Sequence, residues 1–416
     1  MTTSRRTTAA RLVAVATTAA LTLGLAPGAS ADEAGAGASA SRAGDVAGDG
    51  IRDRQLDRLT RAVHEKGAVG VTAELVTPDG TWRGAAGSNE LRPRVRATTD
   101  ARFRAASVSK MFVTVLALQQ VERGRWTLDT TLGQALPGVW PEQDAVTLRQ
   151  LLSHTSGLPE YLTPMVATAD TTPKFREIIS RRRTDRELVD VAKGQPATKR
   201  GEFVYANTNF VLVGMMLERA TGRSLESLVE RRVLGPTRMT RSEWATTPRT
   251  TRPRLKEYAR LYEKVEDLST FHPSMFSGAG ALLTTARDLN RFQRALSRGG
   301  LVRPSLVRRM RSLTSDGGAL GLEYGLGSYR LPDPCAPGRF VYGHDGGSWS
   351  TLTVSYASPR GDRRVTASMT GRDYDGKTAS AQALSKLAVT ALAQTCGGKP
   401  VTSTTTPDTS RLAAAG

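Results

Sequence analysis

The chain has 416 residues, 39% of them hydrophobic and 23% charged, so it can bury a sizeable core and is not a disordered polymer. Its 58 lysines and arginines against 39 aspartates and glutamates give a formal net charge of +19. No internal stretch reaches the roughly 18 consecutive apolar residues that a spanning helix needs, which excludes an integral membrane protein. Such a charge indicates anionic surroundings: nucleic acid, an acidic polymer or an anionic surface.

The first 31 residues have the pattern of a secretory signal peptide. Arg5, Arg6 and Arg11 precede an apolar run from Leu12 to Leu25, and Ala29-Ser30-Ala31 is a small-residue cleavage site. The general secretory route is favoured over the twin-arginine route, because no apolar pair closely follows the adjacent arginines. Cleavage removes three arginines and no acid, so the mature charge is 19 − 3 = +16. We therefore expect a secreted protein that an anionic cell wall holds loosely, and no nucleic-acid partner.

The chain has two cysteines, Cys335 and Cys396, which allow a single disulfide pairing in an oxidising compartment. Cys335 lies in a proline-rich loop, and Cys396 follows a helix-like run over 379–395. A bridge would tie this helix to the loop. The alternative is two unpaired thiols.

Helix and strand signals alternate between two segments that we expect to be disordered, the linker 32–50 and the tail 399–416, which are rich in small and polar residues. An apolar helical spacing begins at Ile51 and stops at Gly67. The further predicted elements are strands over 68–76 and 81–86, a helix over 107–123, strands over 338–344, 351–357 and 364–370, and a helix over 379–395.

The late strands follow one another through short connections, which predicts an antiparallel sheet rather than βαβ units. From about 126 to 270 the pattern consists of helices and long loops. The sequence therefore predicts an α/β fold in which an antiparallel sheet is flanked by helices. Its sheet domain comprises 51–125 and 271–398, with a mainly helical domain, 126–270, inserted.

The first candidate motif is Ser107-Val108-Ser109-Lys110, at the start of a predicted helix. Lys110 follows Ser107 by one turn and lies on the same helix face. The helix dipole favours negative charge at this end, and a partly desolvated lysine can lose its proton and activate the hydroxyl. The alternative is an N-capping serine beside a solvated lysine.

The second candidate motif is Tyr205-Ala206-Asn207, before another apolar helix. We expect Tyr205, near lysine-type charges, to have a lowered pKa and to transfer protons. Asn207 is expected to bond both a substrate amide and Lys110. The alternative is a surface tyrosine beside a helix-capping asparagine.

The third candidate motif is Gly343-His344-Asp345-Gly346-Gly347, at the end of a predicted strand. Glycines there let a substrate backbone approach closely. The N–H of Gly347 is expected to form an oxyanion hole with that of Ser107. A structural role is the alternative for His344, and the sequence contains no G-x-S-x-G nucleophile elbow.

In this order the three motifs resemble those of serine hydrolases with the penicillin-binding fold, in the branch of class C β-lactamases, secreted D-alanyl-D-alanine carboxypeptidases and related esterases. The stretches 146–159 and 279–285 strengthen the resemblance, which runs over about 51–398. Soluble actinobacterial D-alanyl-D-alanine carboxypeptidases are most similar, since they share Tyr324-Gly325-Leu326-Gly327 and the paired positions of Cys335 and Cys396.

The resemblance implies an acyl-serine mechanism without a metal or organic cofactor. Ser107 would be the acylated nucleophile, Lys110 its proton partner and Tyr205 the general base and acid. The implied partners are a peptidoglycan peptide or another small acyl substrate, with β-lactams as covalent ligands of a monomer. The residues implied in substrate binding are Asn207, His344, Asp345, Gly346 and Arg330, and those implied in the oxyanion hole are Ser107 and Gly347.

Two positions depart from the carboxypeptidase pattern. Asp345 stands where these enzymes have threonine, and Tyr329 where they have a carboxylate-binding arginine, although Arg330 is adjacent. A terminal carboxylate would be repelled by Asp345 unless Arg330 or Lys110 compensates.

The expected function is a secreted serine D-alanyl-D-alanine carboxypeptidase that removes the terminal D-alanine of peptidoglycan stem peptides. Asp345 and Tyr329 favour an alternative within the same fold, an esterase or class C-like β-lactamase. A second alternative, from a different class, is a non-catalytic protein that binds the cell wall through its basic surface.

Overall fold

The computed structural model describes residues 44–91, 95–249, 254–261, 264–317, 323–371 and 379–396. The predicted signal peptide, most of the predicted linker and the predicted tail lie outside these residues. Helix α2 (Gly44–Glu65) begins earlier than the predicted start at Ile51, so the last residues of the predicted linker 32–50 are helical. No proline interrupts the chain between Gly44 and Ile51, and the helix can therefore extend toward its N-terminus.

The centre of the fold is a six-stranded antiparallel sheet with the strand order β2-β1-β11-β10-β9-β8. The first strand pairs with the last, with Ala73 opposite Ala367, so the two ends of the sequence form one sheet. This arrangement confirms the predicted antiparallel α/β fold. The strands are β1 (Gly70–Val76), β2 (Thr81–Gly87), β8 (Tyr329–Pro332), β9 (Phe340–Gly347), β10 (Leu352–Ala357) and β11 (Arg364–Thr370).

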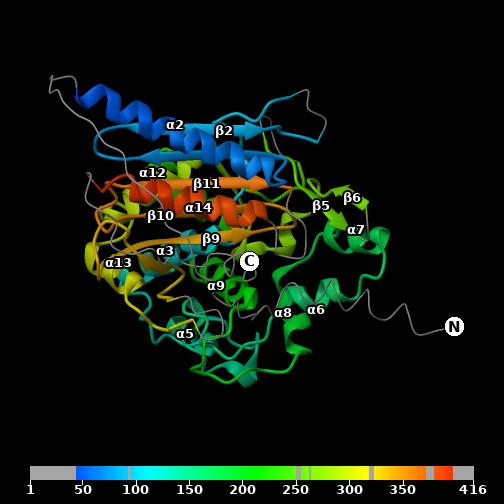
Figure 1. Ribbon diagram of the computed structural model, residues 1–416. Coiled ribbons are helices and arrows are strands. Elements are labelled where there is room, and N and C mark those ends of the chain that lie inside the picture. Colours follow the sequence, from blue (N-terminus) through cyan, green and yellow to red (C-terminus); the bar gives the residue numbers. More distant parts are fainter. Residues whose placement is uncertain are drawn as a thin grey trace, which may run out of the picture.

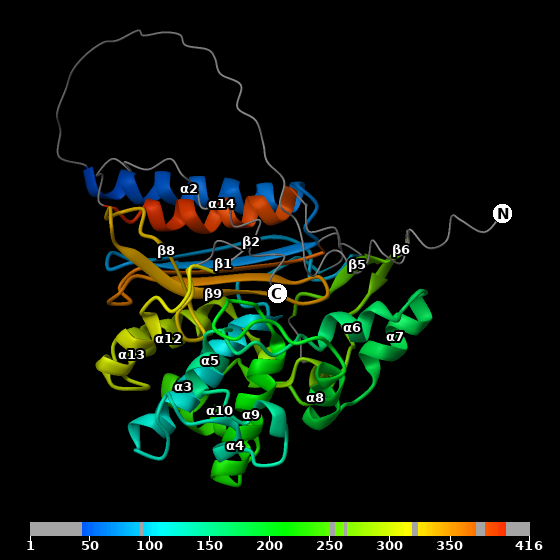
Figure 2. The same ribbon diagram turned by 90° about the horizontal axis from the view of Figure 1, so that it is seen from below.

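Helices cover both faces of the sheet (Figures 1 and 2). Helices α2 and α14 (Ala379–Ala393) lie side by side on one face, and their apolar residues share a core with the sheet. Just after α14, the Gln394 side chain donates to that of Gln55, in the middle of α2, at 2.7 Å. On the other face lies α12 (Ala286–Ser297), whose Gln293 donates to the carbonyl of Ser355 at 3.0 Å.

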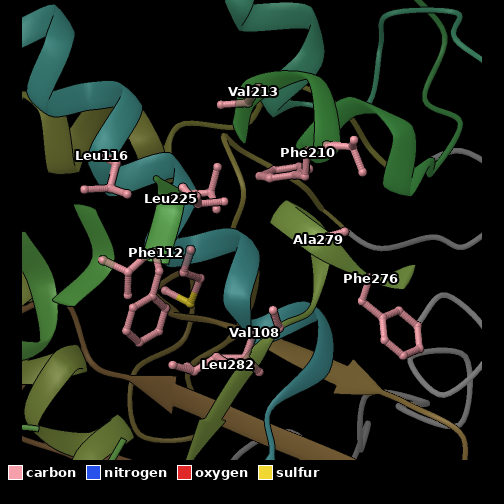
Figure 3. Packing of buried hydrophobic residues seen from close by; sticks show 14 of the residues in the cluster. Val108, Phe112, Leu116, Phe210, Val213, Leu225, Phe276, Ala279 and Leu282 are labelled. Atoms are coloured by element: carbon pink, nitrogen blue, oxygen red, sulfur yellow. The ribbon is translucent and has the colours of Figure 1, made fainter. Parts of the chain in front are cut away.

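Helix α3 (Ser109–Glu122) is the central helix of the second core. Every residue from Ser109 to Gln120 is buried, which is typical of a helix enclosed on all sides. Its Phe112 stacks on Phe292 of α12 with ring centroids 4.0 Å apart. Figure 3 shows α3 residues packed together with apolar residues of the helical region, including Phe210.

The middle of the chain is mainly helical, but it also contains short strands. The helices are α4 (Leu132–Ala135), α5 (Leu148–Leu152), α6 (Leu162–Ala167), α7 (Thr172–Ser180), α8 (Asp185–Lys193), α9 (Asn207–Thr221), α10 (Leu225–Val229) and α11 (Gly235–Thr237). The strands β5 (Tyr258–Leu261) and β6 (Lys264–Asp267) form a hairpin, and β4 (Glu243–Trp244) joins β3 (Phe103–Arg104) and β7 (Leu282–Thr284) in a small sheet.

The sequence analysis did not predict the edge strand β8. This strand has four residues and ends in Pro332, which cannot donate to a neighbouring strand and is tolerated at an edge. Among the described helices, none combines the length and apolar character that crossing a bilayer requires.

A disulfide joins Cys335 to Cys396, with a Cα–Cα distance of 4.9 Å and a sequence separation of 61 residues. It ties the loop after β8 to the end of α14, which confirms the predicted pairing. The bridge therefore links the sheet edge to the terminal helix.

Replacing both cysteines with serine is expected to lower the free energy of unfolding by about 2–4 kcal/mol, because the bridge restricts a long loop of the unfolded chain. Urea unfolding with and without a reductant measures this. The reductant should destabilise the wild type and leave the double variant unchanged, and an equal response of both proteins would contradict the role of the bridge.

Candidate active site

Ser107 lies in a 3₁₀ turn, Ala106–Val108, that leads directly into α3. Ala106 has φ +46°, a left-handed conformation that is strained for a residue with a side chain. The turn is fixed by β7, because the N–H of Ala105 donates to the Leu282 carbonyl at 2.9 Å and the Ser109 hydroxyl accepts from the Leu282 N–H at 3.0 Å. The Ser107 hydroxyl is thus presented from a rigid, strained turn.

The Lys110 ammonium is completely buried and has three hydrogen-bond acceptors. It donates to the Ser107 hydroxyl at 2.9 Å, to Oδ1 of Asn207 at 2.8 Å and to the Ala279 carbonyl at 3.2 Å. Burial lowers the pKa of Lys110 to about 7, although nearby Glu160 and Asp345 oppose this effect. Lys110 can therefore hold or release a proton next to Ser107 near neutral pH.

Tyr205 lies beside both groups, but its ionisation differs from the prediction. The Lys110 ammonium is 4.8 Å from the centre of the Tyr205 ring. Burial raises the pKa of Tyr205 well above 10; the Ser107 hydroxyl lowers it, while Asp345 and Glu160 raise it further. The predicted lowered pKa is wrong, because burial and two carboxylates favour the neutral phenol. Tyr205 can pass a proton on, but Lys110, with a pKa of about 7, is the group that can act as a base near neutral pH.

Asn207 is the first residue of α9 and is held by a carboxylate that the sequence analysis missed. Glu160 accepts the backbone N–H of Asn207 with Oε2 and that of Leu162 with Oε1, the latter at 2.6 Å. A carboxylate at this position also suits the positive end of the α9 dipole. Burial raises the pKa of Glu160, and the two N–H donors and Lys110 oppose that rise. Glu160 therefore raises the pKa of Lys110 through its charge and holds the backbone of Asn207 through a hydrogen bond.

His154 holds the segment that carries Tyr205. Its carbonyl accepts the N–H of Val204 at 2.9 Å, and its Nδ1 accepts that of Ala206 at 3.2 Å. Between these bonds the His154 ring stacks on Tyr205, with ring centroids 4.2 Å apart and planes inclined by 26°. Burial, Lys110 and His344 lower the pKa of His154 well below 6.5, so the ring is neutral. His154 thus fixes Tyr205 on both sides and along its face.

The third motif forms the last part of β9, where one side of the strand is open. Strand β8 pairs only with residues 340–343, so 344–347 extend beyond it. Gly346 packs against the turn that carries Ser107: a Cβ there would overlap the Ala105 carbonyl and lie 2.8 Å from the nitrogen of Ser107. Only glycine lets β9 approach the Ser107 backbone this closely.

The direction of the Gly347 N–H follows from the β9–β10 hairpin. Ser348 donates to Thr351 at 3.1 Å, and Gly347 is the next residue, opposite Leu352. Because hydrogen-bonded and non-hydrogen-bonded pairs alternate in an antiparallel ladder, the Gly347 N–H points away from β10 toward the open edge. This is the orientation that the predicted oxyanion hole with Ser107 requires.

His344 is buried and neutral. Burial, with a contribution from Lys110, lowers its pKa to about 3, although its Nδ1 contacts the backbone oxygen of Asp345. The Tyr324 hydroxyl lies 3.2 Å from Nε2, and the ring of Tyr329 packs 4.6 Å from the His344 ring. His344 therefore contributes packing and hydrogen bonds to the site rather than charge.

Arg330 does not join this cluster. Its guanidinium forms a two-bond ion pair with Glu323, at 2.8 and 2.9 Å, and lies 4.0 Å above the ring of Phe340. Asp345 is buried, and its charge raises the pKa of Tyr329, on which burial has the largest effect. The neighbourhood predicted to bind a carboxylate thus presents a neutral phenol and an acid, while the nearby arginine is already paired.

Comparison with known proteins identifies the family. A protein-family model with the description "Beta-lactamase" matches residues 56–394, which is nearly the whole described fold. The chain belongs to the Beta-lactamase family. Its members are serine hydrolases, and the resemblance stated from the motifs is thereby confirmed.

Individual relatives of this Beta-lactamase family chain carry different names. Penicillin-binding protein 4* of Bacillus subtilis is 25% identical over 289 residues, which cover 66% of this chain and 62% of that protein. A D-stereospecific amidohydrolase from Streptomyces sp. is 28% identical, with TM-score 0.67 and coverage of 76% and 94%. D-amino acid amidase from Ochrobactrum anthropi SV3 shares the fold, with TM-score 0.71, 21% identity and coverage of 82% and 98%. The chain thus spans less than two thirds of the Bacillus protein's length.

The geometry accounts for a division of chemical roles in this Beta-lactamase family site. Lys110 can take the Ser107 proton, Tyr205 can relay a proton as a neutral phenol, and the open edge of β9 can receive a carbonyl oxygen. Glu160 and His154 had no signal of their own in the sequence. Both lie within or next to the stretch 146–159 that carried the resemblance, which marked the segment but not these roles.

In the wild type we expect kcat/KM to rise with pH near 7, the pKa of Lys110, and Glu160→Gln is expected to move this rise to lower pH. The reason is that the carboxylate raises the pKa of Lys110, and its removal lets that pKa fall. We also expect kcat about 10- to 100-fold lower, because Asn207 loses one of its supports. A pH–rate profile measures both effects, and an unchanged or higher pH for the rise would contradict the electrostatic role.

His154→Phe and His154→Asn separate the two functions of His154. Phenylalanine keeps a stacking ring but leaves the Ala206 N–H without its acceptor, so a loss of about 1–3 kcal/mol in unfolding free energy is expected. Asparagine retains an acceptor and tolerates the φ of +57° found at this position, but it removes the stack.

Both His154 variants should lower kcat with little change in KM, since His154 acts through Tyr205. Steady-state kinetics and thermal unfolding give the two readouts. A variant with wild-type kcat and reduced stability alone would show that His154 serves only packing.

Proposed function

We propose that this protein is an exported acyl-serine amidohydrolase that cleaves amide bonds at the carbonyl carbon of a D-residue. Lys110 takes the proton of Ser107, whose oxygen attacks the carbonyl, and the oxyanion receives the N–H groups of Ser107 and Gly347. The tetrahedral intermediate collapses as the leaving amine gains a proton through Tyr205. Water then attacks the ester and restores Ser107 and the free acid.

The observation that carries the substrate class is the Arg330–Glu323 ion pair. A carboxypeptidase must accommodate a terminal carboxylate, and the cation expected for this purpose already has a carboxylate partner. Lys110 is likewise engaged, with three acceptors. Asp345 would repel a second anion nearby. A leaving group without charge, such as an amide, fits this neighbourhood better, in accord with the names of the Streptomyces and Ochrobactrum enzymes.

The second candidate is the D-alanyl-D-alanine carboxypeptidase predicted from the sequence. It is supported by the order of the three motifs and by similarity to a penicillin-binding protein. Export is supported by the signal-like segment 1–31 and by the disulfide, since such bridges persist in oxidising compartments. The monomeric state stays a prediction.

Ser107→Ala is expected to abolish turnover of every substrate and the formation of any covalent adduct. Intact-mass measurement after incubation with a penicillin, with the variant as control, detects the acyl-enzyme. No adduct and no turnover of any amide, ester or lactam by the wild type would contradict the acyl-serine mechanism.

The substrate class is tested with a pair of peptides that both end in D-alanyl-D-alanine, one as the free acid and one as the amide. We expect kcat/KM about tenfold or more higher for the amide, because the acid meets Asp345 and finds Arg330 paired. Release of D-alanine or its amide is followed by chromatography. Preference for the free acid would favour the carboxypeptidase, whereas faster turnover of a lactam or an ester than of either peptide would favour a β-lactamase or an esterase.

A further inference from the structure

One end of the molecule concentrates positive charge that the active site does not use. Residues 286–312, which include α12 and α13 (Pro304–Arg311), contain eight arginines, one aspartate and no lysine or glutamate. They thus carry 8 − 1 = +7 of the chain's formal +19. The two helices contact each other, and Figure 2 shows them together at one end of the fold.

Three of these arginines are engaged within the protein. Arg287 lies 4.0 Å from Glu74, and Arg291 pairs with Asp288 at 3.1 Å. Arg311 donates to a serine hydroxyl and a backbone carbonyl, and burial lowers its pKa to about 10. These three side chains therefore stabilise the fold.

The other five are exposed, and within the described part of the chain none has a side-chain nitrogen within 4.0 Å of a carboxylate oxygen. One acid adjoins them, because the backbone N–H of Arg303 donates to the Glu122 carboxylate at 2.7 Å. We call them the arginine face. It consists of Arg294, Arg298, Arg303, Arg308 and Arg309.

The local sequence explains how the arginine face arises. In α12 the apolar side of the helix, with Leu289, Phe292 and Leu296, is buried, and the solvent side carries Arg294 and Arg298 one turn apart. The positive charge also affects a neighbouring residue. The pKa of Arg364 is lowered mainly by burial, and the charges of Arg294 and Arg298 lower it further. Unpaired like charges repel one another, so an anion that neutralises them gains free energy.

We propose that the arginine face binds a linear sugar-alcohol phosphate polymer through its phosphodiester groups. A guanidinium group can donate two parallel hydrogen bonds to the oxygens of one phosphate. Phosphate groups are therefore favoured over anions that cannot accept such a pair of bonds. The exposed large hydrophobic residues of the described chain are Leu91, Val95, Val204, Val265 and Leu313, which include no aromatic ring for base stacking. Of these only Leu313 adjoins α13, so the face also lacks an apolar anchor for a lipid surface.

The test measures binding of fluorescent poly(glycerol phosphate) to the mature chain by anisotropy at several salt concentrations. If all five arginines neutralise phosphates, the slope of log K against log salt is about −0.7 × 5, or roughly −3.5. Binding should then weaken roughly 100-fold between 50 and 200 mM salt.

A matched pair of triple variants assigns the binding to this surface. Arg294→Gln with Arg298→Gln and Arg308→Gln is expected to weaken binding at least tenfold and to reduce the slope by about 2. The control changes three exposed arginines of α2, where acidic residues alternate with them, and should bind as the wild type does. These control positions are Arg54, Arg58 and Arg61.

Equal losses in both triple variants, or no binding by the wild type, would overturn the proposal. So would tighter binding to phosphatidylglycerol vesicles or to single-stranded DNA with the same number of phosphates. Should the first triple variant fail to fold, Arg308→Gln with Arg309→Gln carries the same test. Turnover of small substrates should persist in all of them, so this result is independent of the proposed function.

Discussion

Burial of the Lys110 ammonium is the constraint on which the site depends. A fully buried cation without partners is very costly, and here the three acceptors come from the turn before α3, from α9 and from the turn at Ala279. The helical region and the sheet domain must therefore meet around one atom. The incomplete compensation of burial also brings the pKa of Lys110 to about 7, where the group can exchange a proton with its serine neighbour.

The remaining ionisable groups reinforce this arrangement. Lys110 contributes to lowering the pKa of both His154 and His344, so neither histidine competes for the positive charge. Burial and two carboxylates keep Tyr205 neutral as well. One cation is thus placed among neutral rings, with Glu160 and Asp345 adjusting its ionisation. This distribution supports the proposed preference for substrates whose reacting end carries no additional negative charge.

The sequence predicted the elements whose signals are local and strong. The hairpin after Gly67, the late strands, α14 and the three motifs were all recognisable, and the structure brings Ser107, Lys110 and Asn207 together by hydrogen bonds. The sequence did not reveal Glu160, because a single acid after Leu158-Pro159 belongs to no recognisable motif. Its role becomes visible only when the fold places α9 against it.

Errors arose where tertiary packing decides the outcome. The pKa of Tyr205 depends on burial, and the availability of Arg330 depends on Glu323, seven residues earlier and across a turn. Strand β8 was too short to give an alternating pattern. The basic composition was visible at once, but only the exposed and buried sides of α12 and α13 separate free arginines from those that stabilise the fold.

The contact between Gln55 and Gln394 has a consequence for engineering this fold. It shows that the end of α14 lies beside the middle of α2, on the face of the sheet opposite α12. A peptide that runs along the first half of α2, roughly 17 Å at 1.5 Å per residue, would join these helices and close the chain into a ring, and new termini could then be opened in a surface loop. The turn that carries Ser107 lies on the other side of the sheet, so such a circular permutation would leave its surroundings intact.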